Sequence, residues 1–564
     1  MKKSTVSLAM WSGLRAAAGM SSLLGAVFCL CTPVHAEEAS GGDIKWTFDG
    51  ELSQGVMWRA SARNNALVGP SNGGTDMRNL DLGDDGNLNY PRKGQVVAAP
   101  ISLLGTLEGE FGNQRVLVRG SLMYDWKNAN FGPLSAEARD IIGKRARLLD
   151  AYWAGTFNTG DESSMEIKLG RQVIMWGESK ILPFGINYFN PLDFSRLRQP
   201  GSTLKDGALP VGAAAVTLST GPTLTLQGFY QLQRAKQELD PAGSFFSDVD
   251  ILGAGAGTTT IAPFIPLPIS RLPDRNYSNS GQFGLAAFLK LEGLGLGFYY
   301  QNLTQRTERT SGYGNAGAFG APQTSYFWEF PKDIETYGVS FNSKLGKGAL
   351  SGEVAYRRNV PIGLDPGAVG NARANAALCV VALGLTPDCP VAIAGPSPLR
   401  ADATGYIKGY AQIEQVAVNL NYLTFFAGSH PFITALGANG GSILLEASAV
   451  HSDMPNQMLL PTLVTDKWHG SAIALLAVDY LRINGSDWSL TPKLVVQTWY
   501  LGDEASGAPF FKGRLQVTPA LQLRRENPDL SFELSYTQTS DHSARGDRVL
   551  SDRDYVAATA RFTF

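Results

Sequence analysis

Hydrophobic and polar positions alternate along most of the chain with a period of two. Residues 44–59 keep the pattern throughout, with Trp46, Phe48 and Trp58 on one face and Lys45 among the polar residues of the other. Such alternation predicts an extended strand with one apolar and one wet face. The pattern recurs at residues 115–126, 223–232, 350–357 and 530–537. The chain is therefore expected to be all-β.

The connections between these strands alternate in length. Short turns such as Gly112-Asn113-Gln114 and Gly346-Lys347 are separated by long polar stretches. The long stretches are residues 60–98, 127–144, 175–211, 234–280, 306–332, 360–404, 452–466 and 541–552. This asymmetry predicts a transmembrane antiparallel β-barrel with long outer loops and short periplasmic turns, of about 18 strands, with about 16 as the nearest alternative.

A soluble β-sandwich or β-propeller is the alternative architecture. Aromatic residues near strand ends favour the barrel, because they suit an interfacial girdle: Trp58, Trp126, Tyr356 and Tyr500. A repeat of propeller-blade length is not visible in the sequence.

Three features of the sequence fit the barrel poorly. Residues 425–441 are too long for the short turn expected there. Pro492 and Pro519 fall inside predicted strands, where proline removes a ladder donor. Each proline predicts a bulge or a shifted strand boundary.

The N-terminus has the layout of a secretory signal peptide. Lys2 and Lys3 precede an apolar run, and Val34-His35-Ala36 offers a cleavage site. We therefore expect a signal peptide over residues 1–36 and a barrel domain over residues 37–564, with a membrane anchor as the alternative to cleavage. Beyond this segment the sequence has no apolar stretch of the roughly 18 residues that a spanning helix needs.

Export through the inner membrane also bears on the cysteines. Cys379 and Cys389 remain after residue 36, and in an exported protein we expect them to form a disulfide. Their spacing matches no zinc motif.

Composition narrows the classes of protein further. The chain has 48 Lys+Arg and 50 Asp+Glu, so its charge does not indicate a nucleic-acid binder. Hydrophobic residues make up 44% and aromatic residues 10%, which excludes a disordered chain.

The C-terminal strand is the most specific local signal. Residues 555–564 alternate again, and Phe562 and Phe564 end the chain on its apolar face. This ending resembles the terminal strand recognised by the bacterial barrel-assembly machinery, so we expect these two rings to act as the assembly signal.

A family resemblance extends over the chain. It rests on residues 170–179 (GRQVIMWGES), on Gly185-Ile186-Asn187, on 190–193 (NPLD), on 198–201 (RQPG) and on Lys205. It continues at residues 84–89, 148–152, 238–241, 280–284 and 552–554. These segments resemble the bacterial domain of unknown function 1302 family. The resemblance implies a porin-like protein of the cell outer membrane, a periplasmic or lipid-carrier-like partner, and an exporter of the resistance-nodulation-division type.

The central block is the candidate site. By the up-and-down order of strands it lies on the outer side, and its mixture of charged and aromatic residues predicts that it folds into the mouth or lumen. There it could narrow the channel and select permeants by charge and size, or its charges could only hold the loop to the wall. The candidate constriction residues are Arg171, Trp176, Glu178, Asn187, Asn190, Asp193, Arg198 and Lys205. Arg171 fits only with a bulge at Gly170 or a rim position, because parity places it on the lipid face.

The inward face of the strands is expected to carry charge. The predicted lumen residues are Arg115, Arg119, Glu353, Arg357, Arg514, Arg524 and Arg561. An excess of arginine would favour anionic or amphipathic permeants.

Enzymatic and cofactor-dependent functions find little support. Histidines are few after residue 36 and widely scattered, and neither a metalloprotease motif nor a phosphate-binding Gly-Lys-Ser/Thr motif is present. His451 and Ser452 are neighbours on one strand, so they face opposite ways and cannot easily form a dyad. The acidic residues 81–89 could hold calcium, but a solvated loop is the simpler interpretation. We expect no enzyme activity, no resident metal and no cofactor.

These observations favour an outer-membrane channel for small hydrophobic or amphipathic molecules. The alternative is a non-conducting barrel that acts as the docking component of an envelope lipid-transfer or export system. The sequence leaves the permeant, the direction of transport and the oligomeric state open.

Overall fold

The computed structural model describes most of the chain after the N-terminal segment. The residues it describes are 39–564 without 42–43, 76–82, 183, 188–189, 248, 258, 262–266, 276–278, 318–320, 365, 396, 454–465, 503–511 and 542–549. The predicted signal peptide lies outside the described residues.

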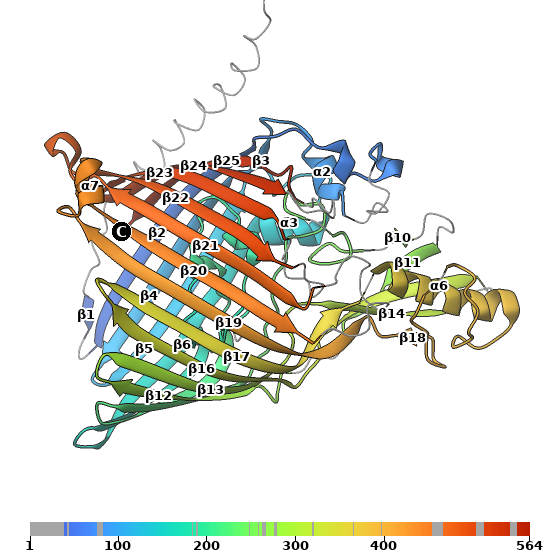
Figure 1. The fold of residues 1–564 in the computed structure, drawn as a ribbon, viewed down its shortest axis with the longest axis horizontal. Coiled ribbons are helices and arrows are strands. Elements are labelled where there is room, and N and C mark those ends of the chain that lie inside the picture. Colours follow the sequence, from blue (N-terminus) through green and yellow to red (C-terminus); the bar gives the residue numbers. More distant parts are fainter. Residues whose placement is uncertain are drawn as a thin grey trace, which may run out of the picture.

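Eighteen antiparallel strands form a closed barrel within this part of the chain (Figure 1). The first nine are β2 (Ile44–Arg59), β4 (Pro100–Phe111), β5 (Gln114–Asp125), β6 (Lys144–Gly160), β7 (Ser163–Gln172), β8 (Val211–Thr220), β9 (Leu224–Gln231), β12 (Phe283–Leu291) and β13 (Leu294–Leu303). The other nine are β16 (Ile334–Leu345), β17 (Gly348–Gly363), β19 (Tyr410–Ala427), β20 (Gly440–Ser452), β21 (Trp468–Asp479), β22 (Trp488–Leu501), β23 (Arg514–Arg525), β24 (Asp529–Asp541) and β25 (Tyr555–Thr563). The predicted all-β barrel and its strand number are confirmed.

The ring closes where the two ends of the chain meet. β25 pairs with β24 on one side and with β2 on the other, and β2 also pairs with β4. Two short strands, β1 (Ala39–Gly41) and β3 (Val96–Ala98), add to β2. A closed ring leaves no unpaired strand edge in the wall.

The wall alternates as the sequence predicts. On β17, Val354 is 47% exposed on the outside, whereas Glu353 and Arg357 are buried inside. Tyr300, Tyr337 and Tyr356 lie on adjacent strands near one end, with ring centroids 5.1 and 6.2 Å apart. An apolar outer band with aromatic residues at its rim is the surface of a barrel that spans a membrane.

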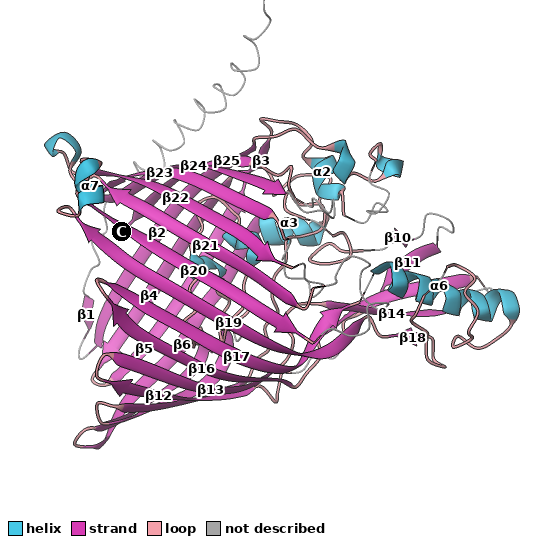
Figure 2. Cartoon of the chain, in the orientation of Figure 1, coloured by secondary structure: helices cyan, strands magenta, loops and turns pink. Residues whose placement is uncertain are grey.

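Helices occur in the connections between strands, some beyond the two ends of the wall and others within the barrel, as Figure 2 shows. They are α2 (Asp85–Asn89), α3 (Ala136–Ile142), α4 (Phe194–Leu197), α5 (Leu204–Gly207), α6 (Pro366–Leu383) and α7 (Pro431–Ala435), with short 3-10 turns η1 (Asn65–Leu67), η2 (Pro70–Asn72) and η5 (Ile483–Gly485). Among the described residues, no helix is long and apolar enough to cross a membrane.

One end of the barrel carries the long connections, and we call it the long-loop end; the other is the short-turn end. A second sheet projects from the long-loop end with α6 beside it (Figure 1). Its strands are β10 (Thr259–Ile261), β11 (Leu267–Arg271), β14 (Arg309–Ala316), β15 (Pro322–Glu329) and β18 (Tyr406–Ile407). Cys379 at the end of α6 forms a disulfide with Cys389, as the sequence predicts.

The three poorly fitting features have structural explanations. The connection 428–439 lies at the short-turn end and contains α7, so it is longer than an ordinary turn. Pro519 is inside β23, and the pairing of β23 with β24 skips Thr518 and Pro519. The pairing of β21 with β22 stops at Lys493, next to Pro492. Each proline therefore lies where one ladder is interrupted and no donor is needed.

Candidate constriction inside the barrel

The connection between β7 and β8 enters the lumen, and its first part crosses to the opposite wall. We call residues 177–182 and 184–187 the crossing segment. Glu353 of β17 accepts hydrogen bonds from the backbone N–H groups of Glu178 and Ile186, the latter at 2.7 Å. A carboxylate that accepts several backbone N–H bonds makes strong, charge-assisted contacts.

A second buried carboxylate repeats this arrangement on β20. Glu446 accepts hydrogen bonds from the backbone nitrogens of Lys180 at 3.0 Å, Ile181 at 2.8 Å and Leu182 at 3.4 Å. The hydroxyl of Ser179 also donates to Glu446, at 3.0 Å. Two wall glutamates therefore satisfy backbone donors that a loop in the lumen would otherwise leave to water.

Other wall side chains fix the same segment. Asn421 donates to the carbonyl of Glu178 at 2.7 Å, and Asn342 donates to the Glu178 carboxylate at 2.9 Å. Arg357 donates to the carbonyls of Phe184, at 3.1 Å, and Gly185. The crossing segment is thus held by strands on the side of the barrel opposite its own entry.

Trp176 anchors the start of the crossing. Its ring packs against Phe229 and Tyr299, with centroids 4.9 and 6.0 Å away, and its Nε1 donates to Gln227 at 2.8 Å. Gly177 follows with φ +84°, a conformation that suits glycine. The apolar ring and the turn together direct the chain inward.

The second part of the connection is held by ion pairs. Asp193 caps α4 and pairs with Arg145 at 2.8 Å and Arg147 at 3.3 Å, and the same two arginines pair with Glu238. Asp193 is only 2% exposed. This group joins β6 to the connections that follow β7 and β9.

The remaining candidates are placed individually. Arg198 pairs with Asp240 at 2.5 Å, and Asn190 accepts a hydrogen bond from the backbone of Ile174 at 3.1 Å. Asn187 lines the cavity described below, and Lys205 is exposed on α5. Arg171 is apart from them, because it lies at the end of β7 and contacts the Leu149 carbonyl and Gln233.

Most predicted lumen arginines are paired with acids of the wall. Arg115 pairs with Glu108 at 3.4 Å, Arg119 with Asp150, Arg514 with Asp541 at 3.3 Å, Arg524 with Asp529 at 3.0 Å, and Arg561 with Glu51 at 2.9 Å. The expected excess of arginine is therefore partly balanced across neighbouring strands.

Sequence reasoning missed several residues of this site. Glu446 was not identified, although it is the only acid in β20. Arg145 and Arg147 were missed as well, although they are two positions apart in β6 and both face inward. A lone charge in an apolar strand and two cations on one strand face are signals that could have found them.

A cavity of about 560 Å³ lies beside the crossing segment. Phe184 and Phe194, in the connection between β7 and β8, line one side of it. Val450 and Trp499 line it from the wall. Its size falls in the range of small-molecule sites, roughly 300–1,000 Å³.

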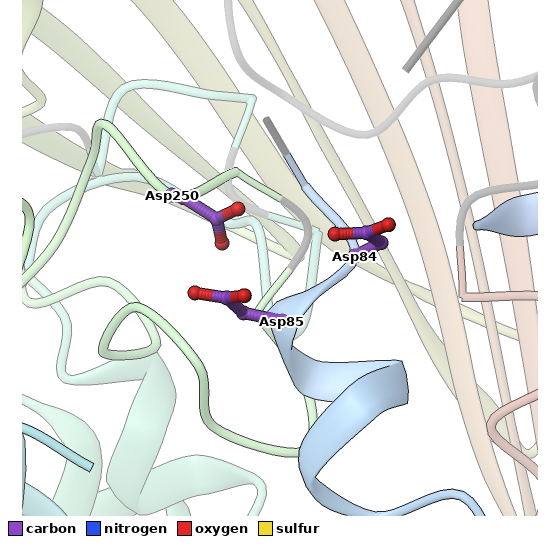
Figure 3. Close-up of side chains that lie close together, drawn as sticks. All are labelled: Asp84, Asp85 and Asp250. Atoms are coloured by element: carbon purple, nitrogen blue, oxygen red, sulfur yellow. The ribbon is translucent and has the colours of Figure 1, made fainter. Parts of the chain in front are cut away.

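An acidic cluster at the long-loop end is a separate feature. Carboxylate oxygens of Asp84, Asp85 and Asp250 lie within 4.8 Å of one another (Figure 3). Asp84 accepts hydrogen bonds from Gly69 N at 2.8 Å and from Asn72, so it holds the neighbouring turn. Burial and the charge of Asp84 raise the pKa of Asp85. The contacts with Gly69 and Asn72 account for the position of Asp84.

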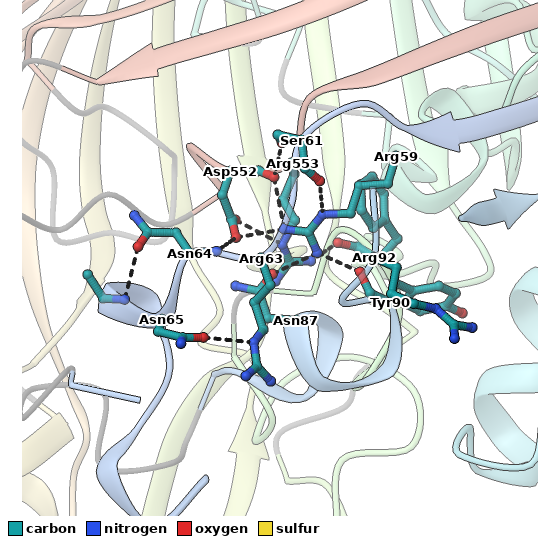
Figure 4. Close-up of polar contacts among 12 residues, drawn as sticks. Arg59, Ser61, Arg63, Asn64, Asn65, Asn87, Tyr90, Arg92, Asp552 and Arg553 are labelled. Carbon is teal, nitrogen blue, oxygen red and sulfur yellow. Dashed lines mark hydrogen bonds and ion pairs between the residues drawn. The ribbon is translucent and has the colours of Figure 1, made fainter. Parts of the chain in front are cut away.

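A buried arginine joins distant segments at the same end (Figure 4). Arg59 is fully buried and donates to Asp552 Oδ2 at 2.6 Å, Asn87 Oδ1 at 3.0 Å and the Tyr90 carbonyl at 2.6 Å. Asn64 N also donates to Asp552, at 2.9 Å. Two of the segments that carry the family resemblance, 84–89 and 552–554, therefore meet in one network.

The histidine and serine considered for a dyad face opposite ways. His451 packs on Trp468, with ring centroids 4.9 Å apart, whereas Ser452 accepts a hydrogen bond from Gln415 inside the barrel at 3.0 Å.

Solved structures of several channels resemble this chain only distantly. A BenF-like porin from Pseudomonas fluorescens Pf-5 is 7% identical, with 92% of this chain and 98% of that chain covered and a TM-score of 0.41. OccK1 (OpdK) of Pseudomonas aeruginosa is 11% identical, with 92% and 98% covered and a TM-score of 0.37. The outer membrane channel DcaP of Acinetobacter baumannii is 11% identical, with 94% and 100% covered and a TM-score of 0.38.

Sequence comparison gives a definite family. Among curated proteins, none matches this chain. The family model described as "Protein of unknown function (DUF1302)" matches residues 17–564. The chain therefore belongs to the DUF1302 family, as its sequence segments predict.

Proposed function

We propose that this protein is an outer-membrane channel for small hydrophobic or amphipathic molecules, with the crossing segment as its constriction. The observation that carries the proposal is the attachment of this segment across the lumen by Glu353 and Glu446, beside a cavity with apolar walls. A barrel with an apolar outer surface and a narrowing inside its lumen has the form of a selective pore.

The crossing segment gives the proposal its test. In the double variant Glu353→Gln and Glu446→Gln, each wall residue loses one acceptor oxygen and presents an amide N–H₂ to backbone donors. The segment should loosen, and the single-channel conductance in planar bilayers should rise about twofold or more. An unchanged conductance in a folded double variant would contradict the role of this segment.

A matched control is available on β24. Glu533 also lies on the barrel wall and pairs with Lys493 at 3.0 Å, at a distance in sequence and structure from the crossing segment's contacts. Glu533→Gln removes one carboxylate charge in the same way and should leave the conductance close to that of the natural protein.

A docking role is the second candidate. The docking role is favoured by the number of hydrogen bonds that fix the crossing segment. A segment held this firmly could keep the lumen of the natural protein nearly closed. In that case the barrel would serve a periplasmic lipid-transfer component or a resistance-nodulation-division exporter. No current from the reconstituted natural protein, together with co-purification of a periplasmic protein, would favour docking over conduction.

A further inference from the structure

The connection between β19 and β20 folds back over the outside of the barrel wall at the short-turn end. Contacts show which face of β20 is outside: Glu446 reaches the crossing segment within the lumen, and Leu445 is 42% exposed on the other face. Gly441 has the parity of Leu445, so it also faces outward. A Cβ on Gly441 would lie 3.0 Å from Ile433 Cδ1, and Ile433 of α7 is fully buried. The helix α7 therefore packs on the outer face of β20, near the start of this strand.

The neighbouring strands hold α7 in the same place. The ring of Phe426 on β19 has its centroid 4.7 Å from that of His430 and 6.4 Å from that of Phe432. Tyr480, directly after β21, donates its hydroxyl to the carbonyl of Leu436 at 3.1 Å. Contacts from β19, β20 and the end of β21 thus fix the helix at the corner of the barrel where Figure 1 shows it.

The helix leaves large apolar side chains uncovered. Phe432 and Leu436, which are one helical turn apart, are 44% and 43% exposed. Leu481 is exposed as well, and its backbone N–H donates to Asn439 of the same connection at 2.7 Å. We call Phe432, Leu436 and Leu481 the α7 patch. Large apolar side chains that cluster in this way mark a contact with another apolar surface.

The sequence around the patch carries no charge. Residues 415–445 include no Asp, Glu, Lys or Arg. Other connections at the short-turn end are charged, for example at Asp161, Lys347 and Glu526. Charges suit a connection that lies in water, whereas a connection that enters the edge of a membrane loses free energy for every charge that it brings toward hydrocarbon. The composition of this connection is therefore that of a segment in contact with lipid.

The α7 patch continues the apolar outer band of the wall. Val418 and Leu420 on β19 and Leu445 on β20 are exposed on the outer face. Gly441, which α7 covers, is four residues from Leu445 along β20. At roughly 3.3 Å per residue, that is roughly 13 Å along the strand. Because lipid surrounds the outer band of such a barrel, lipid is the nearest surface that can cover the patch.

We infer that the α7 patch docks on the membrane surface, with Phe432 and Leu436 inserted among the phospholipid headgroups of the leaflet at the short-turn end. Aromatic and aliphatic side chains of an interfacial helix are stabilised there by the burial of their apolar area. Docking fixes the depth of this rim in the membrane. The inference goes beyond the proposed function, because it holds whether or not the barrel conducts.

The test places an environment-sensitive fluorophore on the patch. Leu436→Cys is labelled with a nitrobenzoxadiazole group in the barrel purified from outer membranes, and Cys379 and Cys389 stay in their disulfide. Lys347→Cys, in the turn between β16 and β17, is the matched control. In nanodiscs of phosphatidylethanolamine and phosphatidylglycerol, lipids with a nitroxide on the acyl chain should quench the Leu436→Cys label about twofold or more relative to the control.

Equal quenching of the two labels, or no quenching on the patch, overturns the inference. Phe432→Cys repeats the measurement at a second position, so the inference stays testable if one variant fails to fold. A patch label that ignores the nitroxide lipids but responds to a higher concentration of the barrel, or to added periplasmic protein, shows that a protein covers the patch. That result also overturns lipid docking.

A charge substitution tests the same contact through stability. Leu436→Asp places a carboxylate against the membrane, where it loses hydration, and should lower the equilibrium constant for folding into phospholipid vesicles about threefold or more. Leu383→Asp is the control, because Leu383 is similarly exposed, at 46%, but lies at the end of α6 beside the outer sheet. Equal losses for the two variants contradict a lipid contact at α7.

Discussion

At the scale of single residues, Gly170 shows how the wall accommodates a charged neighbour. The sequence required a bulge at Gly170 or a rim position for Arg171. The structure keeps both ladders in register through Gly170, which pairs with Tyr152 and Ala213, and places Arg171 at the end of β7. Gly170 has φ +129°, a conformation that residues with a Cβ rarely adopt.

Substitution of Gly170 should therefore be costly. A Cβ at this position would lie 2.3 Å from the carbonyl oxygen of Ala151 and 2.8 Å from Tyr152 Cα. Because both obstacles are backbone atoms, Gly170→Ala should lower the free energy of unfolding by about 2 kcal/mol or more. The measurement is the urea midpoint of folding into lipid vesicles, followed by tryptophan fluorescence.

The control for this variant lies on a neighbouring part of the wall. A Cβ on Gly105 would meet only the ring of Phe48, at 3.4 Å, and Gly105→Ala should shift the midpoint little. If the two variants shift the urea midpoint equally, the close backbone atoms around Gly170 are not the reason why glycine is needed there.

The wall glutamates show where prediction from single residues ends. Parity alone placed Glu353 inside the barrel, but its partners are backbone N–H groups of Glu178 and Ile186, far away in sequence. Glu446 performs the same task and was missed, although it is an isolated acid in an apolar strand. A period of two gives the face of a residue, whereas its partner depends on the path of a long loop.

At the scale of elements, regular strands were predictable and structured loops were not. β2 covers residues 44–59, as the alternation predicts. The second sheet, however, lies in stretches that were interpreted as polar loops. Its buried residues Tyr326, Trp328 and Phe330 form an aromatic run that could have indicated a small core. α6 is rich in alanine, a strong helix former, and was also missed.

The disulfide should stabilise this outer part of the molecule only. Cys379 and Cys389 are 10 residues apart and close a loop at the end of α6. Replacing both by serine should cost this segment about 3 kcal/mol of local stability, because a short closed loop becomes free in the unfolded state. Limited proteolysis should then cut residues 364–409 faster, while the heat-modifiable mobility of the barrel stays unchanged. A loss of barrel mobility would show that the outer sheet and the wall fold as one unit.

At the scale of the whole molecule, the segments that carry the family resemblance converge. Asp193 meets Glu238 through two arginines of β6, and Arg198 meets Asp240. Asp552 meets the 84–89 segment through Arg59. These segments are spread over the chain, but all lie inside or at the long-loop end of the barrel. Their common role is to hold connections against the wall, which explains why a mixed set of charges occurs in loops that would otherwise extend into solvent.

The closure of the barrel gives the last prediction. β25 pairs with both β24 and β2, and Phe564 exchanges two backbone hydrogen bonds with Gly50, at 2.7 and 2.9 Å. Its ring stacks on Phe562 at 5.5 Å. If the two rings are the assembly signal, Phe564→Ala should lower the amount of folded protein in the outer membrane several-fold. The same variant, refolded in detergent and transferred to planar bilayers, should still conduct. Phe157→Ala, an exposed aromatic on β6 that lies apart from the closing strand, should leave the amount unchanged. A Phe564→Ala variant that accumulates normally in cells would show that closure depends on the backbone pairing of β25 and that the terminal ring is dispensable.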